Sequence, residues 1–116
     1  RRDVRHHVRE GASVACATPL SESGATEAVL TTVSVSGLAF EVEGDPTCMP
    51  GTRLASVTVR AGDCLIRGDA LVRSVKVVGA ARFEIGCLFV PESAAAEDRW
   101  MALISGVEVA LGMRGV

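Results

Sequence analysis

Residues 28–43 read AVLTTVSVSGLAFEVE, which is two runs of apolar and β-branched residues separated by a short Ser-Gly bend. Val, Thr and Phe favour extended backbone, and small hydroxyl residues followed by glycine are typical of a tight turn between strands. The stretch therefore predicts two strands, 28–34 and 37–43, that are joined at the bend.

Similar strand-like segments lie on both sides of this pair. They are short and rich in Val, and loops that contain Gly, Pro and Asp separate them. No strand alternates with a long helical segment, so a parallel α/β sheet is not expected. Six or seven short strands at this spacing predict a mainly all-β fold, either a small antiparallel barrel or a sandwich, and closure into a barrel removes exposed edges. The further strand-like segments are 13–17, 52–60, 64–78 and 82–90.

Two of these segments allow more detailed predictions. The alternation in 52–60 places Ala55, Val57 and Val59 on one face of a strand. Residues 64–78 form either a strand pair or one long bent strand, with Gly68 at a bulge.

The pattern changes after Pro91, where a helix is predicted. Ser93 is suited to cap its first turn, and the acidic Glu97 and Asp98 follow early enough to favour its N-terminal end. We expect the apolar stripe of this helix to pack on the barrel or close one of its ends, and docking of a partner domain is the alternative. The stripe consists of Trp100, Leu103, Ile104, Val107 and Leu111.

The length of 116 residues, with 48% hydrophobic and 22% charged residues, fits one globular domain. Its expected parts are a flexible arginine-rich arm at 1–11, an antiparallel barrel at 12–92 and a helix at 93–112. No apolar run has the length of a membrane-spanning helix and no signal peptide is visible, so we expect a cytoplasmic domain without membrane insertion. The missing initiator Met suggests a domain cut from a longer chain.

Charge is unevenly distributed along the chain. The formal net charge is −2, but four arginines against one aspartate give the first nine residues +3, which leaves −5 for the rest. A protein that binds a nucleic-acid polymer is normally basic over a whole face, so no such partner is expected. A short basic segment on an acidic body is better suited to a compact anion.

Neither a metal site nor a catalytic site is predicted. The four cysteines are separated by 32, 16 and 23 residues and form no CxxC pair, so buried free thiols explain them better than zinc or a disulfide framework. The only histidines are the adjacent His6 and His7, and no hydrolase, phosphate-loop or metalloprotease motif is present. The protein is therefore not expected to be an enzyme or to hold a cofactor.

Two features remain that could bind a ligand. Arg1, Arg2 and Arg5 cluster in RRDVR, and guanidinium groups can grip phosphate with two hydrogen bonds and stack on a flat base. The bend TVSVSG offers hydroxyl groups and a glycine that permits close approach of a ligand. The simpler interpretations are a solvated chain terminus and an ordinary Ser-Gly turn.

Together, and in this order, the two features resemble the PilZ family of bacterial cyclic di-GMP receptors. That family has an RxxxR motif on its N-terminal arm and a [D/N]xSxxG motif at the bend between two early strands. Here Arg1 and Arg5 match the first motif, and Ser34 and Gly37 match the second. Arg5 and Arg9 form a second RxxxR, but RRxxR fits the usual arm of the family better. Further similar segments are MPGTRLASVTV, ALVRSVKVV, RFEIGCLFV and the helix around Trp100.

The resemblance implies a six- or seven-stranded antiparallel barrel with a C-terminal helix. It also implies a cyclic di-GMP site in which arm arginines hold phosphates and stack on guanines, while the barrel motif meets a guanine edge. Closure of the arm over the barrel would pass the signal to a partner protein or neighbouring domain. The implied ligand-binding residues are Arg1, Arg2, Arg5, Thr32, Ser34, Ser36 and Gly37.

One position departs from the family pattern, because Thr32 stands where the family has Asp or Asn. A threonine hydroxyl offers a single, weaker contact to a guanine edge, and loss of the contact would remove ~1–3 kcal/mol of binding free energy. This departure motivates the alternative function, a degenerate PilZ domain that does not bind cyclic di-GMP and acts as a protein interaction module. The sequence leaves the affinity, the downstream pathway and the oligomeric state open.

Overall fold

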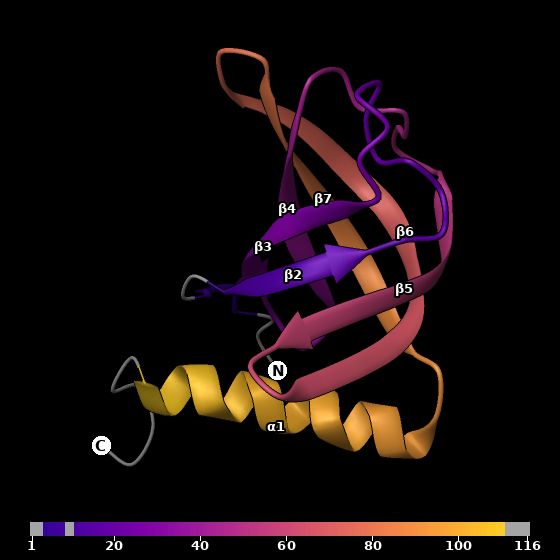
Figure 1. The fold of residues 1–116 in the computed structure, drawn as a ribbon. Coiled ribbons are helices and arrows are strands. Elements are labelled where there is room, and N and C mark those ends of the chain that lie inside the picture. The colour runs from indigo at the N-terminus through magenta and orange to yellow at the C-terminus, as the bar shows by residue number, and fades with distance from the viewer. Residues whose placement is uncertain (1–3, 9–10, 111–116) are drawn as a thin grey trace.

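The computed structural model of the protein describes residues 4–8 and 11–110. Strands dominate these residues, and one helix follows them (Figure 1). In chain order the elements are β1 (His6–His7), β2 (Ala12–Ala15), β3 (Glu27–Val33), β4 (Gly37–Glu43), β5 (Arg53–Ala61), β6 (Cys64–Gly79), β7 (Arg82–Pro91) and α1 (Ala94–Ala110).

Six of the strands close into a barrel. Antiparallel pairings run in the order β3-β2-β5-β6-β7-β4, and β4 pairs with β3 to complete the ring. The extra strand β1 pairs with the end of β3 that lies beyond β2, so both short strands share one edge of β3. The predicted antiparallel barrel is confirmed, with six strands in the ring and a seventh attached to it.

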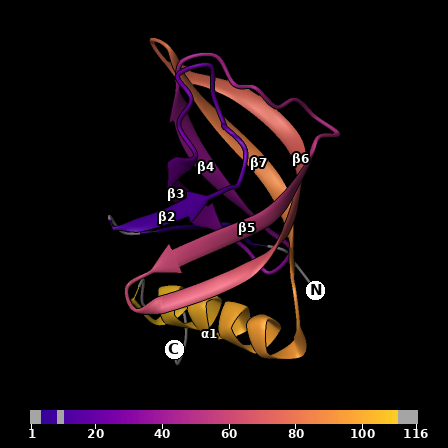
Figure 2. The ribbon, with the colours of Figure 1, turned by 45° about the vertical axis from the view of Figure 1, so that its right-hand side comes forward.

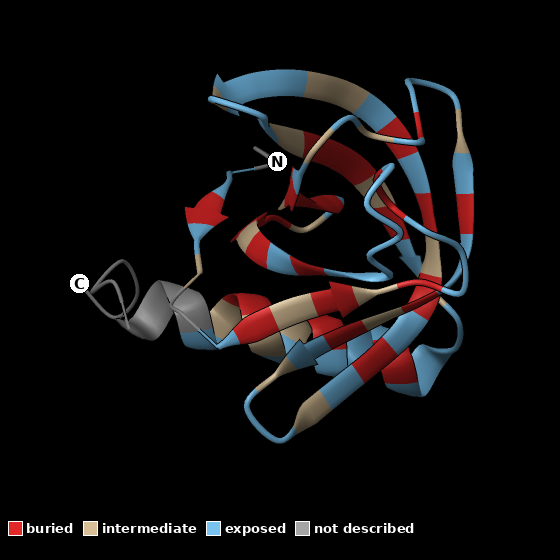
Figure 3. Cartoon of the chain, turned by 45° about the horizontal axis from the view of Figure 1, so that its top comes forward, coloured by how far each residue is buried: buried red, intermediate tan, exposed pale blue. Residues whose placement is uncertain are grey.

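Apolar side chains fill the inside of the barrel, and burial alternates along the strands (Figure 3). The predicted hairpin supplies much of this interior, since β4 places Leu38 and Phe40 fully inside. The core is aliphatic in the main, as the scarcity of aromatic residues requires. Its largest fully buried members on the strands are Val14, Leu30, Val33, Leu38, Phe40, Val57, Val59, Ile66, Val72 and Ile85.

A β-bulge in β5 corrects one detail of the predictions. The register between β5 and β6 shifts between Leu54 and Val57, and Ser56 takes a positive φ of 55° there. The extra residue reverses the alternation, so Leu54 is buried with Val57 while Ala55 is exposed. The prediction that Ala55 shares the inner face of Val57 is therefore wrong.

The second correction concerns Gly68. Residues 64–79 form one long strand, and Gly68 is paired in register with Val57 on one side and Pro91 on the other. A β-carbon at this position would overlap the carbonyl oxygen of Val90 and lie 2.9 Å from the Pro91 Cα. Gly68 is thus required by the close approach of β7, and the predicted bulge at this residue is wrong.

Helix α1 lies across one end of the barrel, next to β6 and β7 (Figures 1 and 2). The Ser93 hydroxyl accepts a hydrogen bond from the Ala96 amide at 3.1 Å, which confirms the predicted cap. Trp100 is 1% exposed, and its ring centroid lies 4.8 Å from that of Phe89 on β7. The apolar stripe therefore packs on the barrel, although the side chain of Val107 and all of Leu111 lie outside the described residues.

All four cysteines are free thiols, and Cys16, Cys48 and Cys87 are buried, while Cys64 is partly exposed. The predicted burial is found for three of the four thiols and not for Cys64. Burial, and then the neighbouring thiols of Cys48 and Cys16, raise the pKa of Cys87 to about 12. Among the described residues, no helix combines the length and the hydropathy that a membrane crossing would need.

Candidate ligand-binding site

Five residues form one row across five strands of the barrel. The register pairs His7 with Thr32, Thr32 with Ala39, Ala39 with Gly86, and Gly86 with Ser74. Residues opposite one another in antiparallel strands point to the same side of the sheet. The adjacent row is buried in the core, so this row faces outward. The small residues of the row, Thr32, Ala39, Gly86 and Ser74, leave room above the sheet.

This room is a hollow of about 290 Å³ on the outer face of the barrel. Gly86 forms part of its floor, and a β-carbon there would lie only 2.6 Å from the Ser74 hydroxyl oxygen. Among the described residues that line it, two carry a cationic group and one carries a carboxylate. The lining residues are Arg5, His7, Thr32, Ser74, Lys76, Glu84 and Gly86.

Arg5 reaches the hollow because β1 is paired with β3. The amide of Val8 donates to the carbonyl of Thr31 at 2.9 Å, and His6, on the opposite face of β1, is 3% exposed. The guanidinium of the exposed Arg5 then donates from Nη1 to the Thr32 hydroxyl at 3.4 Å. Residues 6–8 are thus paired with β3 in this structure, and the flexibility of the arm stays a prediction.

Glu84 is positioned from the other side of the hollow. Its Oε2 lies 3.2 Å from the Thr31 hydroxyl, whose single proton is shared with the Ala39 carbonyl at 3.1 Å. Thr31 occupies the register shift of β3 between Leu30 and Thr32. Lys76 on β6 is the cross-strand partner of Glu84. The hollow therefore presents an ammonium group and a carboxylate side by side on two adjacent strands.

The Ser34–Gly37 bend lies beside the hollow and does not line it. The Ser34 hydroxyl accepts from the Gly37 amide at 3.2 Å, and the Ser34 amide donates to the Gly37 carbonyl at 2.9 Å. Both residues are buried and close the β3–β4 turn, while Ser36 is exposed on that turn. Of the predicted site residues, Arg5 and Thr32 therefore meet in the hollow, Ser34 and Gly37 support it, and Arg1 and Arg2 lie outside the described residues.

Sequence reasoning missed the contributions of β6 and β7 to this hollow. Ser74, Lys76, Glu84 and Gly86 become neighbours of Thr32 only through the register of four strands. The one available signal was that Lys76 is the single lysine of the chain, within the segment ALVRSVKVV.

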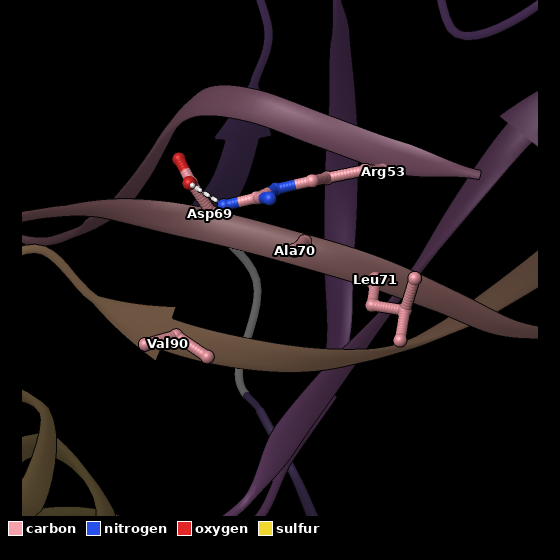
Figure 4. Close-up of a pocket in the computed structure, with 5 residues that line it drawn as sticks. All are labelled: Arg53, Asp69, Ala70, Leu71 and Val90. Carbon is pink, nitrogen blue, oxygen red and sulfur yellow. Dashed lines mark hydrogen bonds and ion pairs between the residues drawn. The ribbon is translucent and has the colours of Figure 1, made fainter. Parts of the chain in front are cut away.

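A second hollow, of about 280 Å³, lies over β5, β6 and β7 (Figure 4). Arg53 and Asp69 point toward each other there and form an ion pair of 3.0 Å, and exposed Leu71 and Val90 flank them. Because its cation is already paired with a carboxylate and most of its wall is apolar, this hollow is poorly suited to a phosphate.

Comparison with protein-family models gives no match, and comparison with the sequences of curated proteins gives none either. Solved structures do match. The chain superposes on the PilZ domain of YcgR from Escherichia coli, a structure with c-di-GMP, with a TM-score of 0.72 and 19% identity, over 96% of this chain and 93% of that one. The apo structure of MrkH from K. pneumonia gives a TM-score of 0.79 and 15% identity, over 97% and 54% of the two chains.

The Bacillus subtilis inhibitor of motility MotI gives a TM-score of 0.69 and 14% identity, over 98% and 52% of the two chains. The protein spans nearly the whole isolated YcgR domain and about half the length of MrkH and MotI. The fold of this chain is therefore that of PilZ domains, as the sequence resemblance implied.

Proposed function

We propose that this domain is a sensor module that binds cyclic di-GMP in the hollow between β1, β3, β6 and β7. The observation that carries the proposal is the Arg5 guanidinium fixed beside Thr32, at the edge of a small-residue floor whose opposite side holds Lys76. The PilZ fold and the c-di-GMP complex of the YcgR domain support it. A binding role, rather than catalysis, is part of the proposal.

The chemistry of the hollow suits a compact dianion with flat bases. The guanidinium of Arg5 can bind two phosphate oxygens at once or stack on a base, and Lys76 adds a second positive charge. The glycine at 86 leaves this part of the floor without a side chain, so a flat ring can approach the sheet there. Arg5 and Lys76 attract an anion at short range, whereas the negative charge elsewhere on the protein is screened by salt.

Signal output would follow from β1, which is only two residues long. Helix α1 lies next to this strand, and the Trp100 indole donates to the Val35 carbonyl in the β3–β4 turn at 3.2 Å. A ligand that pulls Arg5 over the hollow would alter the contact between β1 and α1. We propose this closure as the signal, and we propose a bacterial cytoplasmic location because the ligand is a bacterial second messenger.

Isothermal titration calorimetry of cyclic di-GMP into the purified protein tests the proposal, with GTP as the control ligand. Arg5→Ala should weaken binding about tenfold to a hundredfold, because a hydrogen bond to a charged group contributes ~1.5–3 kcal/mol. Arg60→Ala, which removes an exposed arginine of β5 outside the hollow, is the matched control and should bind like the wild type. Equal affinity of the Arg5 and Arg60 variants would contradict the assigned site.

The second candidate function is an interaction module that does not bind the nucleotide. Thr32 at the family's Asp or Asn position favours it, as do the exposed Leu71 (38%) and Val90 (65%) of the second hollow. Within the described part of the helix stripe, Trp100 and Ile104 are buried and do not provide the surface. A folded wild-type protein that gives no heat with cyclic di-GMP at high concentration would decide for this candidate.

A further inference from the structure

The hollow proposed for a dianionic ligand contains the carboxylate of Glu84, and this needs an explanation. Two unit charges of the same sign 4 Å apart repel even in water, and the repulsion grows where solvent is excluded. In the described part of the chain the ion pairs are Arg53–Asp69 and Arg82–Glu41, so Glu84 is not neutralised by one of these. Lys76 beside it stabilises the carboxylate in the free protein, but the carboxylate favours an anionic ligand only if that ligand also brings hydrogen-bond donors to it.

The position of this carboxylate matches the gap that Thr32 leaves. The Glu84 carboxylate lies 3.2 Å from the hydroxyl of Thr31, the residue next to Thr32, and both Glu84 and Thr32 line the same hollow. Thr32 itself offers one hydroxyl, which already accepts a hydrogen bond from Arg5. Among the described residues that line the hollow, the carboxylate acceptor is therefore on β7, two strands away from Thr32.

Guanine has the edge that fits this arrangement. Its Watson–Crick edge carries an acceptor, O6, followed by two adjacent donors, N1–H and N2–H₂, and a carboxylate can accept from both donors at once. Lys76, the cross-strand partner of Glu84, can donate to O6 or N7. Adenine lacks the paired donors and presents an amino group where guanine has O6.

We propose that Glu84 is the guanine-recognising acceptor of this site and replaces the acidic side chain that is missing at Thr32, with Lys76 as its donor partner. The inference rests on the proposed function and deepens it, because it assigns base specificity to the Lys76–Glu84 pair. It also explains how a protein with threonine at the motif position can still distinguish guanine from adenine.

The test compares cyclic di-GMP with cyclic di-AMP by calorimetry for the wild type, Glu84→Gln and Glu41→Gln. Glu41 is the cross-strand neighbour of Glu84 on β4 and does not line the hollow, so its amide variant is the matched control. Glu84→Gln should lower the affinity for cyclic di-GMP at least about tenfold and reduce the preference for it over cyclic di-AMP. Glu41→Gln should leave both quantities unchanged.

The sign of the effect separates recognition from simple electrostatics. If Glu84 only repels phosphates, its neutralisation must raise the affinity for both dinucleotides. Addition of Thr32→Asp to the Glu84→Gln variant should restore affinity and preference, since it returns an acidic acceptor to the motif position. Equal or tighter binding by Glu84→Gln with unchanged preference would overturn the inference while leaving the proposed function intact. A silent wild type would overturn both.

Discussion

Gly37 is the motif residue whose role the structure defines most sharply. It begins β4 and pairs with Leu88 of β7. A β-carbon on Gly37 would overlap the carbonyl oxygen of Cys87 and lie 3.2 Å from its carbonyl carbon and 3.4 Å from the Leu88 Cα. All three obstructing atoms belong to the backbone, so Gly37→Ala must move β4 away from β7 where the two strands pair.

We expect Gly37→Ala to lower the free energy of unfolding by about 3 kcal/mol or more. Overpacking against side chains, which can rotate away, typically costs ~1–3 kcal/mol, and backbone offers no such escape. Displacement would also weaken the hydrogen bond between the Gly37 amide and the Ser34 hydroxyl, a further ~1 kcal/mol. Such a loss is a large share of the ~5–15 kcal/mol that stabilises an ordinary domain.

Urea unfolding, followed by the fluorescence of the single and buried Trp100, measures this loss. Gly106→Ala is the control, because a β-carbon at this glycine of α1 meets no atom within 4 Å. There the same substitution should raise the free energy of unfolding by ~0.5–1 kcal/mol through higher helix propensity. A Gly37→Ala protein within about 0.5 kcal/mol of the wild type would refute the argument from close strand approach.

Two other predictions concern the interior. Because burial and the thiols of Cys48 and Cys16 raise the pKa of Cys87 to about 12, the folded thiol stays protonated where an unfolded one, with its ordinary value of 9.0, ionises. The free energy of unfolding should not depend on this thiol below pH 9 and should fall by ~1.4 kcal/mol per pH unit above it. In urea unfolding measured from pH 8.5 to 10.5, stability should therefore decline less steeply for Cys87→Val than for the wild type. Equally steep declines would contradict the assignment. Trp100→Phe should keep an aromatic ring against Phe89 but leave the Val35 carbonyl without its indole donor. The free energy of unfolding, measured by thermal unfolding with circular dichroism, should fall by ~1–2 kcal/mol. A loss below about 0.3 kcal/mol would show that this hydrogen bond is dispensable.

The fold could be predicted from the sequence because its signals are local. Alternating Val-rich runs, a Ser-Gly turn at 34–37 and the Ser93 cap each specify their own segment. The failures came from non-local causes. The alternation in β5 breaks at Ser56, where the chain bulges opposite Asp69, and the Ser56 amide donates to that carboxylate at 3.4 Å. The local sequence of residues 55–57 does not by itself predict such a register shift.

The site could be predicted only for the residues that belong to the two motifs. Arg5 and Thr32 are both motif positions, and the structure joins them at 3.4 Å. Lys76 and Glu84 occupy ordinary alternating positions of long strands, so the sequence marks them as outward-facing and nothing more. Their place beside Thr32 depends on the register of β3, β4, β7 and β6, which no single strand encodes.

The closed ring also has a kinetic consequence. The β3–β4, β5–β6 and β6–β7 pairings are local hairpins, whereas β2–β5 and β4–β7 join residues such as Ala12 with Ala61 and Gly37 with Leu88. Closing such long loops costs chain entropy before the contacts form, so the hairpins should assemble first and the β2–β5 and β4–β7 pairings last. A part of the ring without the β2–β5 and β4–β7 pairings would keep unpaired strand edges. The protein should therefore fold as a single unit, and its N-terminal strands, synthesised first, must wait for β5 and β7 to emerge.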